Sequence, residues 1–213
     1  MALFYQHNIN DDTKLAIWKI EEQDNFFLSH VPLKKEVTHP YKRLQHLAGR
    51  YLLPSLFDDF PLKSIQIADT RKPYLEDEQF HFSISHSGNY AAAVVSKSRR
   101  VGIDIELVTS RILRIAPKFL NRHEEEYLED WQHLSSIYIE LVTILWSSKE
   151  AIYKWYGKGG VDFKNHIHLT EAIIFRPNEW INLSFIFSKE DNIKLKVSAR
   201  IFDGLVLAEV HNG

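Results

Sequence analysis

The chain has 213 residues, 45% of them hydrophobic, and a formal net charge of −2. This length and apolar content suit one large domain or two small ones, and the near-neutral charge argues against a nucleic-acid partner. The absence of cysteine excludes disulfides, thiolate zinc sites and cysteine nucleophiles. The sequence lacks a secretory signal and any apolar run of roughly 18 residues, so we expect a cytoplasmic protein with no membrane partner.

The first half of the sequence combines short strands with two helices. Apolar residues at helical spacing predict helices at residues 24–29 and 41–56, the second ending near Pro54. The last two predicted strands form a hairpin that has the polar residues 85–89 as its tip. The predicted strands of this half are residues 15–21, 64–68, 80–84 and 90–96.

The second half begins with a predicted strand at residues 101–108. Helical patterns follow at residues 113–119, 122–134 and 137–156, the last read as one long helix or two abutting ones. A Gly-Lys-Gly-Gly segment then ends the helix. The remaining predicted strands are residues 167–169, 172–175, 181–187, 193–201 and 205–210.

The Gly-Ile-Asp-Ile-Glu segment at residues 102–106 contains two carboxylates on one face. Alternate side chains of a strand point the same way, so Asp104 and Glu106 lie together while the isoleucines face the core. Adjacent carboxylates repel, and a cation between them keeps both ionised. Hard oxygen ligands of this kind suit Mg²⁺ together with substrate phosphates. The alternative is a strand whose solvent face happens to be acidic.

The Trp-Ser-Ser-Lys-Glu-Ala-Ile-Tyr-Lys segment at residues 146–154 reads as the start of a helix. Glu150 could supply a third metal ligand, but Ser147 as N-cap with Glu150 three residues later also fits a capping box. Lys154 could meet a ligand phosphate or assist proton transfer, or it could form an ordinary helical pair with Glu150. The residues alone leave both interpretations open.

Two other polar segments lie in predicted turns. Ser85 and His86 at the hairpin tip offer hydrogen-bond donors and acceptors, but an exposed turn explains them as well, and no Gly-x-Ser-x-Gly elbow supports a hydrolase. Lys72 precedes Pro73, which fixes the backbone and could present the ammonium to a phosphate. The alternative for Lys72 is a simple basic turn.

Taken in order, these segments resemble the 4′-phosphopantetheinyl transferase family. Residues 102–106 and 146–154 match its two signatures, G-[IV]-D-[IV]-E and [FW]-[ST]-x-K-E-[AS]-x-x-K. A mild departure is Ser83, where family members often have asparagine. The supporting matches are Leu-Ala-Gly-Arg-Tyr-Leu-Leu at 47–53, Arg-Lys-Pro at 71–73, Phe-Ser-Ile-Ser-His-Ser at 82–87 and Phe-Leu-Asn-Arg-His-Glu at 119–124.

The resemblance implies an α+β fold of two similar α/β halves in a pseudo-twofold arrangement, residues 1–100 and 101–213, with the active site in the cleft between them. The chain length resembles the surfactin-synthetase-activating type, which is a monomer. Such enzymes transfer the 4′-phosphopantetheine arm of coenzyme A to a serine of an apo acyl or peptidyl carrier protein. They use Mg²⁺, or Mn²⁺ in its place, and release adenosine 3′,5′-bisphosphate.

The resemblance also implies which residues form the metal site. Asp104, Glu106 and Glu150 would hold Mg²⁺ on the diphosphate, with Glu150 as the candidate base for the carrier serine and Lys154 contacting the phosphates. Glu124 matches an acid near the metal, but the two glutamates that follow it leave the register open.

Other residues are expected to face the substrates. The second half would carry the metal and face the carrier protein. The acidic helix of the carrier would dock near three cations, Arg111, Arg114 and Lys118. The first half would hold the 3′-phosphate and adenine end of coenzyme A, through Lys72, Ser85 and His86 and, on a looser match, Arg43 and Arg50.

Two other functions compete with transfer. A non-catalytic coenzyme A-binding or carrier-docking module of the same fold would bind without turnover. An unrelated metal-dependent phosphohydrolase would release phosphate from coenzyme A without any carrier.

Overall fold

The computed structural model describes residues 3–32 and 37–211. The chain folds into two compact units, Met1–Ile105 and Glu106–Gly213, and each combines a sheet, helices and its own apolar core. The predicted α+β class is therefore confirmed, while the pseudo-twofold relation between the halves stays a prediction. The division between the units follows Ile105, inside strand β7 (Val101–Leu107), rather than residue 100.

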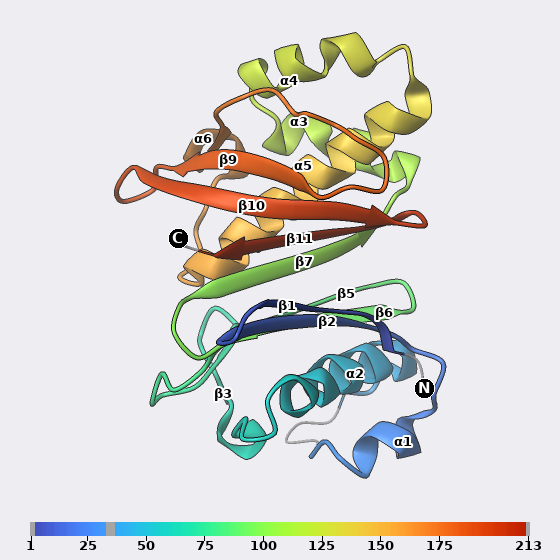
Figure 1. Ribbon diagram of the computed structural model, residues 1–213, viewed down its shortest axis with the longest axis vertical. Coiled ribbons are helices and arrows are strands. Elements are labelled where there is room, and N and C mark those ends of the chain that lie inside the picture. The colour runs from blue at the N-terminus through green and yellow to red at the C-terminus, as the bar shows by residue number, and fades with distance from the viewer. Residues whose placement is uncertain (1–2, 33–36, 212–213) are drawn as a thin grey trace. The chain divides into compact units, whose positions relative to one another are not determined.

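An antiparallel sheet forms the centre of the N-terminal unit (Figure 1). Helix α2 (Pro40–Leu56) packs against β2, β5 and β6, and α1 (Asp24–Leu28) packs against α2. Trp18, Phe27 and Leu52 are among the buried residues between these layers. In sheet order the strands are β1 (Leu3–Asn10), β2 (Thr13–Lys19), β6 (Tyr90–Ser96) and β5 (His81–Ser87).

The sequence predicted most of this unit but missed its first strand. The hairpin of β5 and β6 is confirmed, whereas no strand was expected over β1, whose residues alternate less clearly between polar and apolar. Helix α2 ends at Leu56, the last residue of the predicted range, and it continues through Pro54, where the sequence suggested a stop. The small elements between α2 and β5 are η1 (Leu62–Ser64), β3 (Gln66–Ile67) and β4 (Pro73–Tyr74).

The turn of the hairpin is shorter than predicted. Strand β5 continues to Ser87, which pairs with Tyr90, so the turn is only Gly88 and Asn89. Gly88 has φ 50°, a left-handed conformation that glycine adopts without strain. The prediction that Ser85 and His86 lie in an exposed turn is wrong, because a two-residue turn keeps both in the strand. Consecutive strand residues point to opposite faces, so their side chains diverge.

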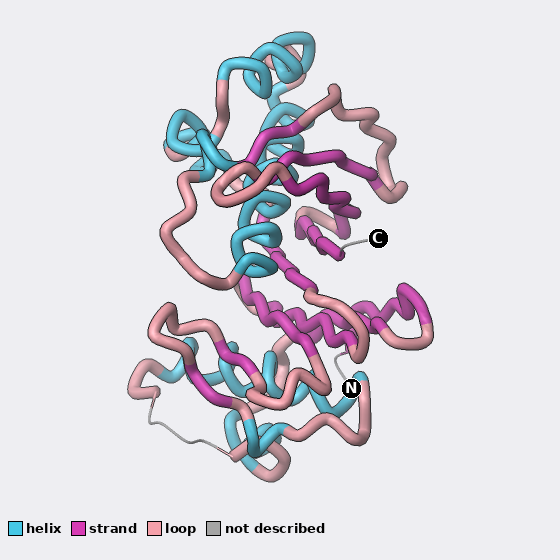
Figure 2. Tube along the Cα trace, turned by 90° about the vertical axis from the view of Figure 1, so that its left-hand side faces the viewer, coloured by secondary structure: helices cyan, strands magenta, loops and turns pink. Residues whose placement is uncertain are grey.

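A second, five-stranded sheet forms most of the C-terminal unit, with order β8 (Ile167–Leu169), β9 (Ile181–Phe187), β10 (Ile193–Phe202), β11 (Leu205–His211) and β7. Helix α5 (Ser135–Tyr156) packs against β10 and β11, as Figures 1 and 2 show from two sides. The remaining elements are η2 (Ser110–Arg114), α3 (Ala116–Phe119), α4 (Arg122–Leu128), η3 (Glu129–Trp131) and α6 (Phe163–His166).

One predicted strand of this unit does not form. Residues 172–175 are irregular, and Ile174 is 75% exposed. Strand β8 already pairs with β9 up to Leu169, and the Thr170 N–H then donates to the Ser184 carbonyl. The apolar residues that follow have no neighbouring strand to pair with, so their pattern does not produce a strand.

Helix α5 is one continuous helix of 22 residues. Its buried residues include Leu141, Leu145 and Ile152, so a single apolar face continues across the whole element. Trp146 to Lys154 therefore lie in its middle and last turns, and the prediction that a helix starts there is wrong. Ser147 is not an N-cap, which removes the capping explanation for Glu150. The helix ends at Gly157, with φ 74°, as predicted.

Within residues 3–32 and 37–211, no helix has the length and apolar character that a bilayer span requires.

A glycine allows α2 to approach strand β5. A Cβ atom built on Gly49 would lie 2.5 Å from Cγ2 of Ile84. We expect Gly49→Ala to lower the free energy of unfolding by about 1–3 kcal/mol, because the overlap forces strand or helix to shift. Urea denaturation measures the change, with Ser55→Ala on the exposed side of α2 as the control.

The double variant Gly49→Ala, Ile84→Ala tests the cause. Its loss of stability should be smaller than the sum of the two single losses, because removing the Ile84 branch relieves the overlap. Additive losses would show that the effect of Gly49→Ala arises elsewhere.

Candidate functional site

Two serine hydroxyls of β5 hold the acidic strand β7 within the N-terminal unit. The N–H groups of Ile103 and Ile105 donate to Oγ of Ser83 and Ser85, each at 3.2 Å. The Ser85 hydroxyl in turn donates to Oδ1 of Asp104 at 2.8 Å. Asp104 is 6% exposed, so the interpretation of this strand as a solvated acidic face is wrong for Asp104. Ser85 thus fixes the orientation of the first predicted metal ligand.

The three carboxylates of the predicted metal site lie on two elements. Asp104 and Glu106 are on β7, and the half-buried Glu150 is on α5. In the described ranges, no three His, Cys, Asp or Glu side chains meet as a metal-binding group. The residue types fit a hard divalent cation, since all three offer carboxylate oxygens. The metal site stays a prediction.

Arg50 on α2 and His86 on β5 are the electrostatic neighbours of a partly buried histidine, His46. Arg50 Nη1 donates to Nδ1 of His46 at 2.9 Å. Burial, then the charges of Arg50 and His86, lowers the pKa of His46 to about 4, so this ring is neutral at physiological pH and can accept the bond. Burial also lowers the pKa of Arg50. Arg50 and His86, which were predicted from distant segments, therefore lie in one electrostatic neighbourhood.

Lys72 belongs to a second cationic group in the same unit. Burial, then the charge of Arg100, lowers the pKa of Lys72 to about 8. The pKa of His81 is also lowered, mainly by burial and with contributions from Arg100 and Lys72. Cations that depress each other's pKa values in a partly buried setting are stabilised by an anion, so this group suits a phosphate. Arg100 and His81 were not identified from the sequence.

Arg43 has a structural partner. Its guanidinium forms an ion pair with Asp24 and so links α2 to α1. The expected contact of Arg43 with coenzyme A stays a prediction.

A buried lysine forms the centre of the C-terminal unit's polar interior. Lys149 is fully buried, and its Nζ donates to Oε2 of Glu124 at 2.7 Å. The same atom donates to the carbonyl oxygens of Phe119 at 2.7 Å and Phe163 at 3.0 Å. These three acceptors match the three protons of an ammonium group. Burial lowers the pKa of Lys149, and the charge of Glu124 opposes this shift.

Glu124 is equally enclosed by protein donors. Its Oε2 also accepts the Asn121 N–H, and its Oε1 accepts the Leu169 N–H, both at 3.0 Å. Asn121 caps the Glu124 N–H in return, which completes a capping box at the start of α4. The Asn-x-x-Glu pattern at 121–124 could have indicated this from sequence. The register is now clear, because Glu125 and Glu126, unlike Glu124, are exposed.

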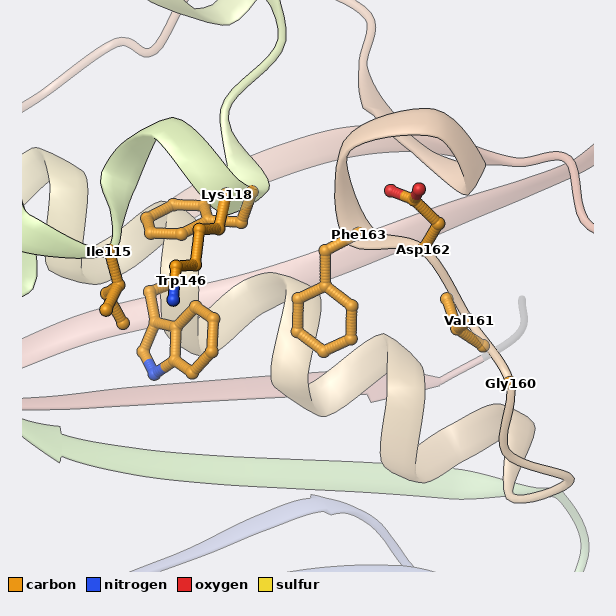
Figure 3. A pocket seen from close by; sticks show the side chains of 8 residues that line it. Ile115, Lys118, Trp146, Gly160, Val161, Asp162 and Phe163 are labelled. Atoms are coloured by element: carbon orange, nitrogen blue, oxygen red, sulfur yellow. The ribbon is translucent and has the colours of Figure 1, made fainter.

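A groove that the sequence did not predict lies between α3 and α6. It has a volume of about 560 Å³. Figure 3 shows Lys118 extending from α3 toward Trp146, with Phe163 on the other side of the indole. Trp146 packs between Phe119 and Phe163, with ring centroids 5.1 and 5.5 Å apart. The lining is thus mainly apolar, with three aromatic rings, and its two charged residues are Lys118 and Asp162.

Comparison with known sequences gives the family. Residues 100–204 match the model of the 4′-phosphopantetheinyl transferase superfamily. This stretch of the chain is therefore similar to members of that superfamily. The matched residues contain strand β7, helix α5 and the Lys149 network.

Several curated members of the superfamily are similar to this chain. The 4′-phosphopantetheinyl transferase gsp of Aneurinibacillus migulanus is 29% identical over 171 residues, 73% of this chain and 70% of that protein. Enterobactin synthase component D of Salmonella typhi is 33% identical over 117 residues, 53% and 47% of the two chains. The transferase AcpT of Escherichia coli K12 is 32% identical over 130 residues, 59% and 64%. The chain spans about half the length of some curated relatives that it matches.

Removing the buried cation from the C-terminal unit should be strongly destabilising. We expect Lys149→Met to lower the free energy of unfolding by about 3–5 kcal/mol, because the Glu124 carboxylate would remain buried without its partner. The double variant with Glu124→Gln should recover part of this loss. Urea denaturation followed by circular dichroism measures all three proteins.

The matched control is Lys158→Met, which removes an exposed ion pair with Glu190. It should leave stability nearly unchanged. Equal losses for Lys149→Met and Lys158→Met would contradict a special role for burial.

Proposed function

We propose that this protein transfers the 4′-phosphopantetheine arm of coenzyme A to a serine of an apo acyl or peptidyl carrier protein. The observation that carries the proposal is the ordered pair of signatures on β7 and α5, within the residues that match the superfamily. In the reaction, a bond forms between the serine oxygen and the transferred phosphorus. The bond to the leaving group breaks, and adenosine 3′,5′-bisphosphate departs.

The N-terminal unit would bind the nucleotide end of coenzyme A. Lys72 and Arg100 form one cationic group, and Arg50 and His86 belong to another, both suited to phosphate oxygens. Ser85 was expected at this end as well. Its hydroxyl proton is donated to Asp104, so we assign Ser85 to orienting the carboxylate instead.

The carboxylates of Asp104, Glu106 and Glu150 would hold Mg²⁺, and the bound cation would neutralise charge on the diphosphate. Lys154 would contact the phosphates through its ammonium group. Glu150 would accept the proton of the carrier serine. Positioning of the two substrates and stabilisation of charge then account for most of the rate acceleration.

The groove between α3 and α6 would receive the carrier protein. Its aromatic lining suits an apolar helix face, and nearby cations suit the acidic residues around such a face. These cations are Arg111, Arg114 and Lys118.

A transfer assay tests this function. Incubation with coenzyme A, Mg²⁺ and an apo carrier should increase the carrier mass by about 340 Da, the mass of the phosphopantetheine arm. Asp104→Asn keeps the size of the side chain and an acceptor for Ser85 but removes the charge. It should reduce the rate by about 100-fold or more. The control Asp203→Asn, in the exposed turn between β10 and β11, should retain full activity.

Other outcomes of this assay identify the competing functions. Tight coenzyme A binding in calorimetry, with no change in mass for any of several carriers, would support a non-catalytic binding module. Phosphate release without a carrier would support a phosphohydrolase. Full activity of Asp104→Asn would remove Asp104 from the site.

The pKa of Lys72 predicts how coenzyme A binding depends on pH. Its pKa of about 8 means that the ammonium is charged below this pH and neutral above it. Since a phosphate binds the charged form, the Kd for coenzyme A should rise between pH 7 and 9.5, by up to about tenfold per pH unit above the pKa. Titration calorimetry measures this dependence.

Lys72→Met should bind coenzyme A more weakly at pH 7 and lose the pH dependence. Lys194→Met, a change on the exposed side of β10, should retain both. An unchanged pH dependence in Lys72→Met would assign the titration to another group.

A further inference from the structure

One ammonium group connects the two walls of the aromatic groove. Phe119 belongs to the α3 wall and Phe163 to the α6 wall, and both line the groove. Their carbonyl oxygens both accept a hydrogen bond from Lys149 Nζ, at 2.7 and 3.0 Å. The separation of the walls is therefore limited by the reach of a single nitrogen atom.

The third bond of Lys149 fixes this nitrogen in place. It goes to Glu124, which is held by the N–H groups of Asn121 and Leu169. With all three protons donated to protein acceptors, no proton of the ammonium remains for a substrate phosphate. Lys149 thus differs in role from Lys154, although both are lysines of the same signature.

The α6 wall is also fixed at its other end. Lys189 Nζ donates to the Gly159 carbonyl and lies 5.0 Å from the centroid of the Tyr156 ring. A weaker bond at 3.4 Å joins Lys164 Nζ to the Pro117 carbonyl, at the mouth between the two walls. The segment from Gly159 to Phe163 is therefore held by a lysine at each end, and both of these hydrogen bonds are partly buried.

Stability alone does not explain a buried ion pair at this position. A well-packed apolar pair of similar volume is often as stable or more stable, because burying two charges is costly. An apolar side chain at position 149, however, could not hold two carbonyl oxygens at a defined distance. Holding these two carbonyl oxygens at a fixed separation is therefore the function that an ammonium group can perform and a methionine side chain cannot.

We propose that Lys149 is a positioning residue that sets the width of the groove between α3 and α6, and through it the recognition of the carrier protein. This inference rests on the proposed function for the identity of the groove's ligand. It assigns no contact between Lys149 and either substrate. The aromatic side chain that reports on groove width is Trp146, which packs between the two walls.

The first test measures the groove without any substrate. The protein has five tryptophans, and labelling with 5-fluorotryptophan gives each a ¹⁹F resonance. The variant Trp146→Phe assigns the resonance of Trp146. In the double variant Glu124→Gln, Lys149→Met, which avoids an unpaired buried charge, this resonance should shift or broaden while the other four stay in place. Lys194→Met should leave all five unchanged.

The second test measures steady-state kinetics with the same proteins. The KM for the carrier should rise about tenfold in the double variant, whereas the KM for coenzyme A should stay within about twofold. Lys189→Met removes the hydrogen bond to Gly159 at the other end of the wall and should change the carrier KM in the same direction by a smaller factor. This variant keeps the test valid if the double variant does not fold.

The outcomes separate this inference from the proposed function. If the wild-type protein transfers no arm, the proposed function fails, but the ¹⁹F spectra still decide whether Lys149 sets the groove width. An unshifted Trp146 resonance in a folded double variant overturns the inference. Equal increases of both KM values also overturn it, because they would indicate a general structural role.

Discussion

The buried pair of Lys149 and Glu124 is the interaction on which the C-terminal unit most depends. Each charge is surrounded by donors or acceptors from segments that are far apart in the chain, and each would be unfavourable without the other. The pair joins α5 to the capping box of α4, the end of α3 and the start of α6. Because this pair fixes α5, it also fixes the positions of neighbouring residues on the helix, including Trp146 and Glu150.

A second anchor of a different kind acts in the N-terminal unit. The hydroxyl groups of Ser83 and Ser85 accept the N–H groups of Ile103 and Ile105 on β7. A hydroxyl can accept one bond and donate another, so Ser85 supports the strand and orients the Asp104 carboxylate at once. The family pattern often has asparagine at position 83, and the structure shows that serine performs the supporting role here.

The proposed phosphate-binding and metal-binding roles fall to different sets of charged side chains. The N-terminal unit gathers cations whose pKa values are depressed by burial and by each other, which suits the binding of phosphates. The two signatures supply carboxylates on β7 and α5. Lys149, one of the two lysines of the second signature, donates all its protons to protein acceptors in the interior, and Lys154 is the candidate for contacting the phosphates.

The sequence by itself determined the resemblance to the family, the α+β class, strand β7, the hairpin of β5 and β6, and the helix stop at Gly157, because these depend on local spacing and composition. It could not determine that Ser147 lies inside α5, since a local capping pattern carries no information on the apolar face that extends the helix on its other side. The strand expected at residues 172–175 lacked a partner, which only the sheet could reveal. The roles of Lys149, Glu124 and the groove depended on contacts between segments that are 14 to 45 residues apart, and only tertiary structure brings these together.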